Sequence, residues 1–162
     1  MIKPARRQII QTVILCAVML LMAFPVHAGF VLGFWLLFLI PLTIKSLFTI
    51  LVKKEEKKQK IIQIALWSIS CSIIAFHHIY LHKTSKKYAN FVSNAVESFY
   101  LKNGVYPKSL VDAGINPESA KKFRVHFLNS NSQPLLMYPA TWIVFSTYYY
   151  DFKIKKWLFR SS

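Results

Sequence analysis

The chain has few of the residues on which several kinds of site depend. Among its 162 residues are 2 cysteines, 4 glycines and 6 acidic residues. Two cysteines cannot form the disulfide framework that holds many small exported domains together, so any folded part must be held by its own apolar core. The glycines lie far apart in the chain, which excludes a glycine-rich phosphate-binding loop.

Carboxylates are especially scarce in the C-terminal half. Glu97, Asp112, Glu118 and Asp151 lie apart along the chain and form no paired motif. A glycosidase pair or a carboxylate metal site is therefore not expected, and we expect a protein without catalytic residues or cofactors. The 21 basic residues give a net charge of +15, but no nucleic-acid motif accompanies them, so no nucleic-acid partner is expected.

Long apolar runs dominate the first half of the chain. They cover residues 9–24, 30–52 and 61–81. A helix needs about 20 apolar residues to cross the hydrocarbon core of a bilayer. The runs therefore predict a transmembrane region over residues 1–82, with helices at about 7–24, 30–52 and 61–82 and a loop at 53–60.

The first run has an alternative interpretation as a signal peptide. Lys3, Arg6 and Arg7 precede it, and residues 26–28 offer a cleavage site ahead of Gly29. Cleavage would leave a chain that starts with the next apolar run, and the stretch is longer than the apolar core of most signal peptides. An uncleaved helix is the favoured interpretation.

The lysines and arginines near the runs predict the orientation. Cations precede the first run, the loop 53–60 holds 5 lysines, and residues 25–29 hold none. Because short cytoplasmic loops are rich in Lys and Arg, the N-terminus and the loop 53–60 are placed inside. The expected location is a bacterial inner membrane, with residues 83–162 in the periplasm. Lys83, Lys86 and Lys87 oppose this assignment, but a following domain of about 80 residues is translocated largely regardless of charge.

Helical spacing continues beyond the third run. Apolar residues recur at intervals of three and four from Tyr88 to Phe99, and Gly104 is a good helix stop. Short turns or helices are expected at 109–113 and 117–122, the second capped by Asn116. Strands are expected at 123–129, 135–138, 141–150 and 156–159, with a turn at 151–155 opened by Asp151.

Residues 88–110, YANFVSNAVESFYLKNGVYPKSL, resemble the segment of type IV pilins and pseudopilins in which a long helix ends before an aromatic-Pro step. The resemblance extends over roughly residues 61–159. It implies an α+β membrane protein whose third transmembrane helix continues into a pilin-like helix packed on an antiparallel sheet of about four strands. Residues 61–69 lack the acidic residue of a pilin and no prepilin leader precedes them, so pilin processing and polymerisation are not expected.

Histidines and one lysine are candidates for chemistry near the membrane. His77, His78 and His82 cluster at the outer end of the third run, where imidazoles are weak candidates to bind zinc or copper or to sense pH. The favoured interpretation is that they are amphipathic residues at the water boundary. Lys45 lies within the second run, and we expect it to extend toward Lys53 and Lys54 rather than to mark a transport pathway.

The C-terminal end combines aromatic and basic side chains as interfaces often do. Residues 142–150 are predicted to alternate between the two faces of one strand. The candidate partner-binding residues are Tyr148, Tyr150, Lys153, Lys155, Lys156, Trp157 and Arg160. The alternative is an ordinary sheet core with solvated lysines.

These features together predict a non-enzymatic inner-membrane protein whose periplasmic domain binds a protein partner, which the basic charge suggests is acidic. One hypothesis is an accessory factor of a pilus, secretion or envelope complex. The alternative is a membrane-bound immunity protein that neutralises an exported antibacterial toxin.

Overall fold

The computed structural model describes residues 4–52, 56–130 and 133–161. The chain divides into two compact units, unit 1 (Met1–His78) and unit 2 (Ile79–Ser162). Helix α3 (Lys57–Asn103) contributes its first part to unit 1 and its second part to unit 2.

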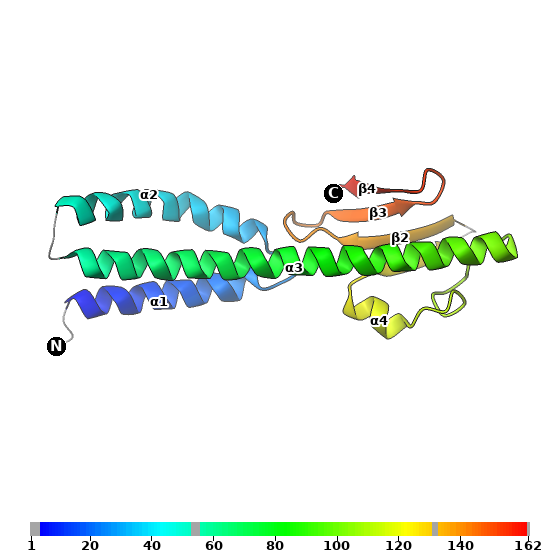
Figure 1. The fold of residues 1–162 in the computed structure, drawn as a ribbon, viewed down its shortest axis with the longest axis horizontal. Coiled ribbons are helices and arrows are strands. Elements are labelled where there is room, and N and C mark those ends of the chain that lie inside the picture. The colour runs from blue at the N-terminus through cyan, green and yellow to red at the C-terminus, as the bar shows by residue number, and fades with distance from the viewer. Residues whose placement is uncertain (1–3, 53–55, 131–132, 162) are drawn as a thin grey trace. The chain divides into compact units, whose positions relative to one another are not determined.

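Unit 1 consists of helices α1 (Pro4–Ala23) and α2 (Phe30–Val52) beside the first part of α3 (Figure 1). All three helices are long and apolar enough to cross a membrane, by length and composition. Buried residues such as Met19, Leu39 and Ile74 hold them together, while many other apolar side chains on α1 and α2 are exposed. The three long apolar helices predicted from the sequence are thus confirmed.

The loop predicted at 53–60 is shorter than expected. Residues 53–55, and with them the expected approach of Lys45 to Lys53 and Lys54, lie outside the described residues. Helix α3 begins at Lys57, so residues 57–60 belong to the helix. Lysine and glutamine are good helix formers, and a polar first turn continues directly into the apolar part of the helix.

In unit 2, local signals determine where the helices begin and end. Gly104 follows α3 with φ of 73°, and its N–H donates to the Tyr100 carbonyl at 2.8 Å. Glycine adopts this left-handed conformation without strain, so it ends the helix as predicted. Helix α4 (Pro117–Lys122) begins at the predicted cap, where Asn116 Oδ1 accepts a bond from the Glu118 N–H at 2.9 Å.

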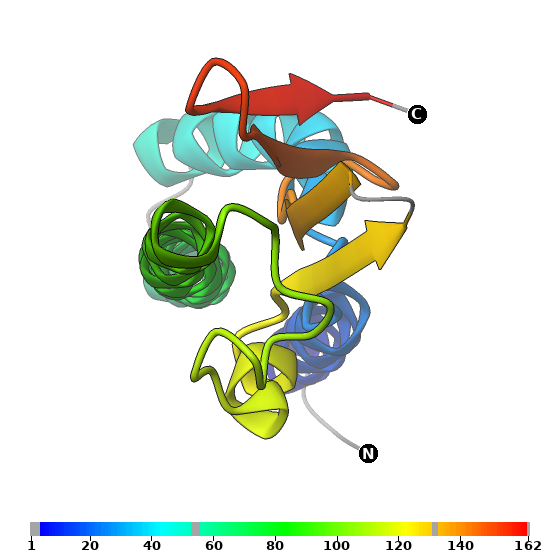
Figure 2. The same ribbon diagram turned by 90° about the vertical axis from the view of Figure 1, so that its right-hand side faces the viewer.

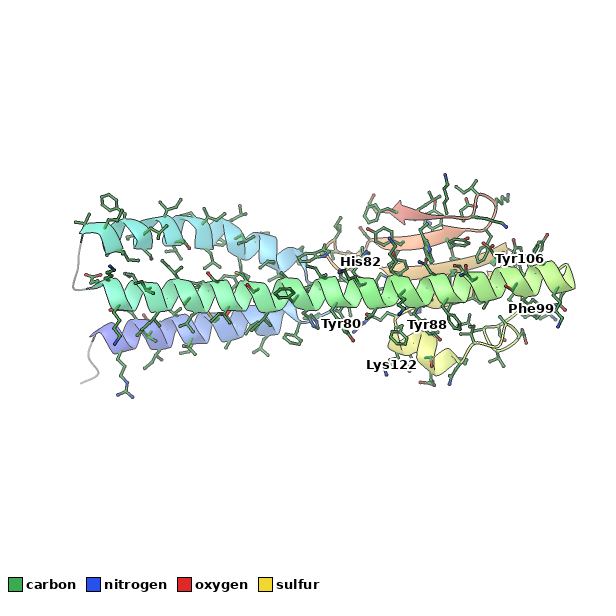
Figure 3. All side chains as sticks on the ribbon, viewed as in Figure 1. Tyr80, His82, Tyr88, Phe99, Tyr106 and Lys122 are labelled. Carbon is green, nitrogen blue, oxygen red and sulfur yellow. The ribbon has the colours of Figure 1, made fainter. Side chains whose placement is uncertain are left out.

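Aromatic contacts attach α4 to α3. The Tyr88 ring stacks on Phe123 with centroids 4.6 Å apart, and Lys122 Nζ lies 5.9 Å from the Phe123 centroid (Figure 3). Near the end of α3, Tyr100 stacks on Tyr106 with centroids 4.3 Å apart. These stacked pairs fix the segment between α3 and β1 against the long helix.

The sheet of unit 2 has four antiparallel strands in the order β1 (His126–Ser130), β2 (Gln133–Pro139), β3 (Thr147–Asp151) and β4 (Lys156–Arg160). Helix α3 lies along one side of this sheet (Figure 2). The predicted combination of a helix with a four-stranded antiparallel sheet is confirmed.

Two strand predictions need correction. Residues 123–125 lie before β1, and Arg124 has φ of 59°, which breaks an extended backbone. Residues 141–146 form a loop between β2 and β3, closed by a bond from the Ala140 N–H to the Ser146 carbonyl at 2.9 Å. The predicted alternation is therefore wrong for 142–146, because a continuous apolar run does not reveal where a hairpin turns back. Asp151 does open the last turn, accepting the Lys153 N–H at 2.8 Å.

The core of unit 2 lies between α3 and the sheet. Ala89, Val92 and Val96 are fully buried, and their spacing of three and four places them on one face of the helix. They pack in one cluster with Leu136 and Tyr138 of β2. The opposite face of the sheet does not contribute to this core.

Candidate functional site

The three aromatic members of the predicted partner-binding set belong to the core side of the sheet. Tyr150 is 9% exposed and donates a hydrogen bond to Glu97 of α3. Trp157 Nε1 donates to Asn90 Oδ1, also of α3, at 2.6 Å. The Tyr148 ring is half-buried and stacks on another core ring. These positions match the alternative interpretation, an ordinary sheet core.

The basic members of the set lie in two places. Lys153 and Lys155 are exposed in the β3–β4 turn, and Lys155 Nζ lies 3.6 Å from Glu97 Oε2. Lys156 and Arg160 are exposed on β4, where they alternate with Trp157 and so face away from α3. The structure therefore brings Lys155 and Tyr150 to the same carboxylate, while Lys156 and Arg160 lie on the other face of the sheet. Partner binding by the predicted set stays a prediction.

The side of the sheet that faces away from α3 carries a different apolar surface. Cross-strand pairing aligns Met137, Tyr149 and Leu158 in one row across β2, β3 and β4. Leu128 of β1 pairs with Leu135 of β2, and they are 57% and 39% exposed. We call this surface the outer sheet face, formed by Leu128, Leu135, Met137, Tyr149 and Leu158 with Lys156 and Arg160 at its rim.

Sequence reasoning missed the apolar part of the outer sheet face. The signal was present in β2, where apolar residues occupy consecutive positions from Leu135 to Tyr138 and so supply both faces. Beside β1, a groove of about 440 Å³ extends from this face to α4, lined by His126, Leu128 and Met137 and by Ala120 and Lys121.

The charge of unit 2 is strongly positive, with 12 basic and 4 acidic residues. Three of the carboxylates have hydrogen-bond partners within unit 2. Glu97 accepts from Tyr150, Asp112 accepts from the Ser109 N–H at 2.8 Å, and Asp151 accepts from the turn. These bonds explain the placement of the carboxylates, while lysines and arginines are spread over the exposed surface.

The candidate histidines make different contacts in the two units. In unit 1, His77 and His78 donate from Nε2 to the carbonyls of Phe24 and Ala23, at 3.2 and 2.8 Å, and so satisfy carbonyls at the end of α1. In unit 2, the His82 ring lies on the sheet side of α3, 5.5 Å from the Tyr148 ring (Figure 3). Across residues 4–52, 56–130 and 133–161, no group of three or more His, Cys, Asp or Glu is placed to hold a metal ion.

The outer sheet face and its groove are candidate recognition surfaces of unit 2. Comparisons of the chain with protein-family models, with curated proteins and with solved structures found no match.

Proposed function

We propose that this chain is a three-span protein of the bacterial inner membrane whose pilin-like unit 2 lies in the periplasm and binds an acidic protein partner. In this role it serves as a non-enzymatic accessory factor of a pilus, secretion or envelope complex. The observation that carries the proposal is the outer sheet face, a partly exposed apolar surface with a basic rim.

Membrane insertion is supported by the exposed side chains of unit 1. Large apolar residues such as Leu37, Phe48 and Leu51 are 69%, 68% and 82% exposed on α2. Contact of these side chains with hydrocarbon carries no free-energy penalty, whereas their exposure to water is unfavourable. Arg6, Arg7 and the lysines at the start of α3 are consistent with a cytoplasmic position for that end of unit 1.

Protein binding is supported by the chemistry of the outer sheet face. Tyr149 and Met137 are of residue types enriched in interfaces, and Leu128 and Leu135 provide exposed apolar area. The positive charge of unit 2 favours a partner with an acidic rim, because complementary charge speeds association and suppresses wrong partners. The structural roles of Glu97, Asp112 and Asp151 are consistent with binding rather than catalysis.

Site-specific crosslinking in native cells tests this proposal. The photoreactive residue p-benzoylphenylalanine is placed at Leu128 or Leu158 on the outer sheet face, and at Leu101 on α3 as a matched control that is 77% exposed. We expect one adduct of defined mass from the two sheet positions and none from the control. Lys156→Glu combined with Arg160→Glu should abolish the adduct, whereas Lys121→Glu combined with Lys122→Glu on α4 should weaken it less.

The identity of the crosslinked protein separates the functional classes. A component of a pilus, secretion or envelope complex supports the accessory role. An exported toxin would overturn that role in favour of immunity. Adducts at the control position equal to those at Leu128 and Leu158, or no adduct at any position, would refute binding through the outer sheet face.

A further inference from the structure

The helices of unit 1 line an open cavity of about 410 Å³ with both polar and apolar walls. Helix α2 has 23 residues, and its four residues with a hydroxyl or a charge all line this cavity. They are Thr43, Lys45, Ser46 and Thr49. Such side chains are rare in a helix as apolar as α2, and their convergence on one point indicates a site rather than chance polarity.

The wall opposite α2 is built by hydrogen bonds between α1 and α3. Gln63 Nε2 donates to Thr12 Oγ1 at 3.2 Å, and Lys60 Nζ donates to Gln63 Oε1 at 3.2 Å. The Thr12 hydroxyl donates in turn to the Gln8 carbonyl at 3.0 Å. These bonds hold Lys60 and Gln63 in place on the cavity wall, so a ligand would meet donors that are already positioned.

The charge of the cavity has one sign. Lys45 and Lys60 both line it, and among the described residues no carboxylate does. The Ser46 and Thr49 hydroxyls donate to carbonyls of their own helix at 2.8 and 2.9 Å. The donors that line the cavity therefore include two ammonium groups and the amide of Gln11, and such donors suit an oxyanion.

The cavity also fits the position of a lipid head group. Its lining residues come from the beginning of α1, the end of α2 and the beginning of α3, which lie at the same end of unit 1 (Figure 1). Leu15 and Leu42 add apolar surface to the polar lining. A phosphate with a glycerol or acyl portion attached would use both kinds of surface.

We infer that this cavity binds a phosphate group through Lys45 and Lys60, carried by an anionic phospholipid or supplied as free phosphate. This binding goes beyond the partner recognition proposed for unit 2 and involves none of the same residues. Under the proposed orientation the cavity lies at the cytoplasmic leaflet, which anionic lipids make negative.

Native mass spectrometry of the full chain in neutral detergent tests the inference. The probes are phosphatidylglycerol, with phosphatidylcholine as the zwitterionic control, and inorganic phosphate as a competitor. We expect selective retention of phosphatidylglycerol, weakened about tenfold or more by Lys45→Met or Lys60→Met. Lys58→Met, an exposed lysine of α3 outside the cavity, should change retention by less than about twofold, since surface attraction alone is weak.

Conservative variants and the competitor make each outcome decisive. Lys45→Arg keeps the charge and should restore most of the binding that Lys45→Met removes, which separates charge loss from misfolding. Selective phosphatidylglycerol binding supports a lipid source, and phosphate binding that depends on Lys45 supports a free-phosphate source. Equal retention of both lipids together with no phosphate binding, or equal losses in Lys58→Met and Lys45→Met, would overturn the inference.

Discussion

The phenol of Tyr150 on β3 donates a hydrogen bond to the carboxylate of Glu97 on α3. The other carboxylate oxygen lies 3.6 Å from Lys155 Nζ in the β3–β4 turn. One helix carboxylate thus connects a central strand and the final turn to α3. Burial, together with the bond to Glu97, raises the pKa of Tyr150 to about 12.

Replacing Tyr150 by Phe should destabilise unit 2. The change removes the hydroxyl and leaves a carboxylate that has lost one donor, which costs about 1–2 kcal/mol of unfolding free energy. The measurement is chemical unfolding of the full chain in neutral detergent, followed by near-UV circular dichroism. Tyr149→Phe, on the outer sheet face, is the control and should stay within about 0.5 kcal/mol. Equal losses in both variants would contradict a specific role for the bond to Glu97.

The stability of unit 2 should fall as the pH rises from 10 toward about 12. Because the folded state raises the pKa of Tyr150, the unfolded chain loses this proton first, and stability that is fully present below pH 10 is lost as the pH approaches the folded value. Burial also raises the pKa of Tyr138. Unfolding midpoints measured across this range should decline less steeply in Tyr150→Phe than in the unchanged chain. Parallel slopes would show that groups other than Tyr150, such as Tyr138 or the lysines, cause the decline.

Gly104→Ala should destabilise unit 2 by about 1 kcal/mol, because an L residue at φ of 73° is strained. An added Cβ would meet no atom within 4 Å, so the cost comes from the backbone alone. Gly33→Ala in α2 meets nothing within 4 Å either and has no positive φ, so it should be neutral or mildly stabilising. Thermal unfolding of the two variants provides the comparison. A neutral Gly104→Ala would mean that the end of α3 rearranges readily.

The proposed orientation predicts which cysteines a membrane-impermeant maleimide reaches. The natural Cys16 is buried and Cys71 half-buried, and both are replaced by Ala to give a clean background. Val105→Cys, at a site 62% exposed in unit 2, should be labelled in spheroplasts. Lys58→Cys, at the start of α3, should be labelled only after the membrane is permeabilised. The reverse pattern would contradict a periplasmic unit 2.

Local rules predicted most elements of this chain. The bounds of α2, the end of α3 before Gly104, the cap at Asn116 and the turn at Asp151 each depend on residues within a few positions of one another. Apolar runs and helical spacing depend on equally short windows. For that reason the three long helices and the four strands were open to prediction from residue order alone.

Long-range packing decided which residues form a surface. The segment 141–146 turns back as a loop. Tyr150 and Trp157 face α3 because they bond to Glu97 and Asn90, which lie 53 and 67 residues earlier in the chain. The cavity of unit 1 likewise joins Thr12 with Gln63, 51 residues apart. Residue order by itself determined the class of this protein, three apolar helices and a helix-backed sheet. Only the tertiary structure decided which sheet face stays open and which polar side chains meet, because those outcomes depend on contacts between distant segments.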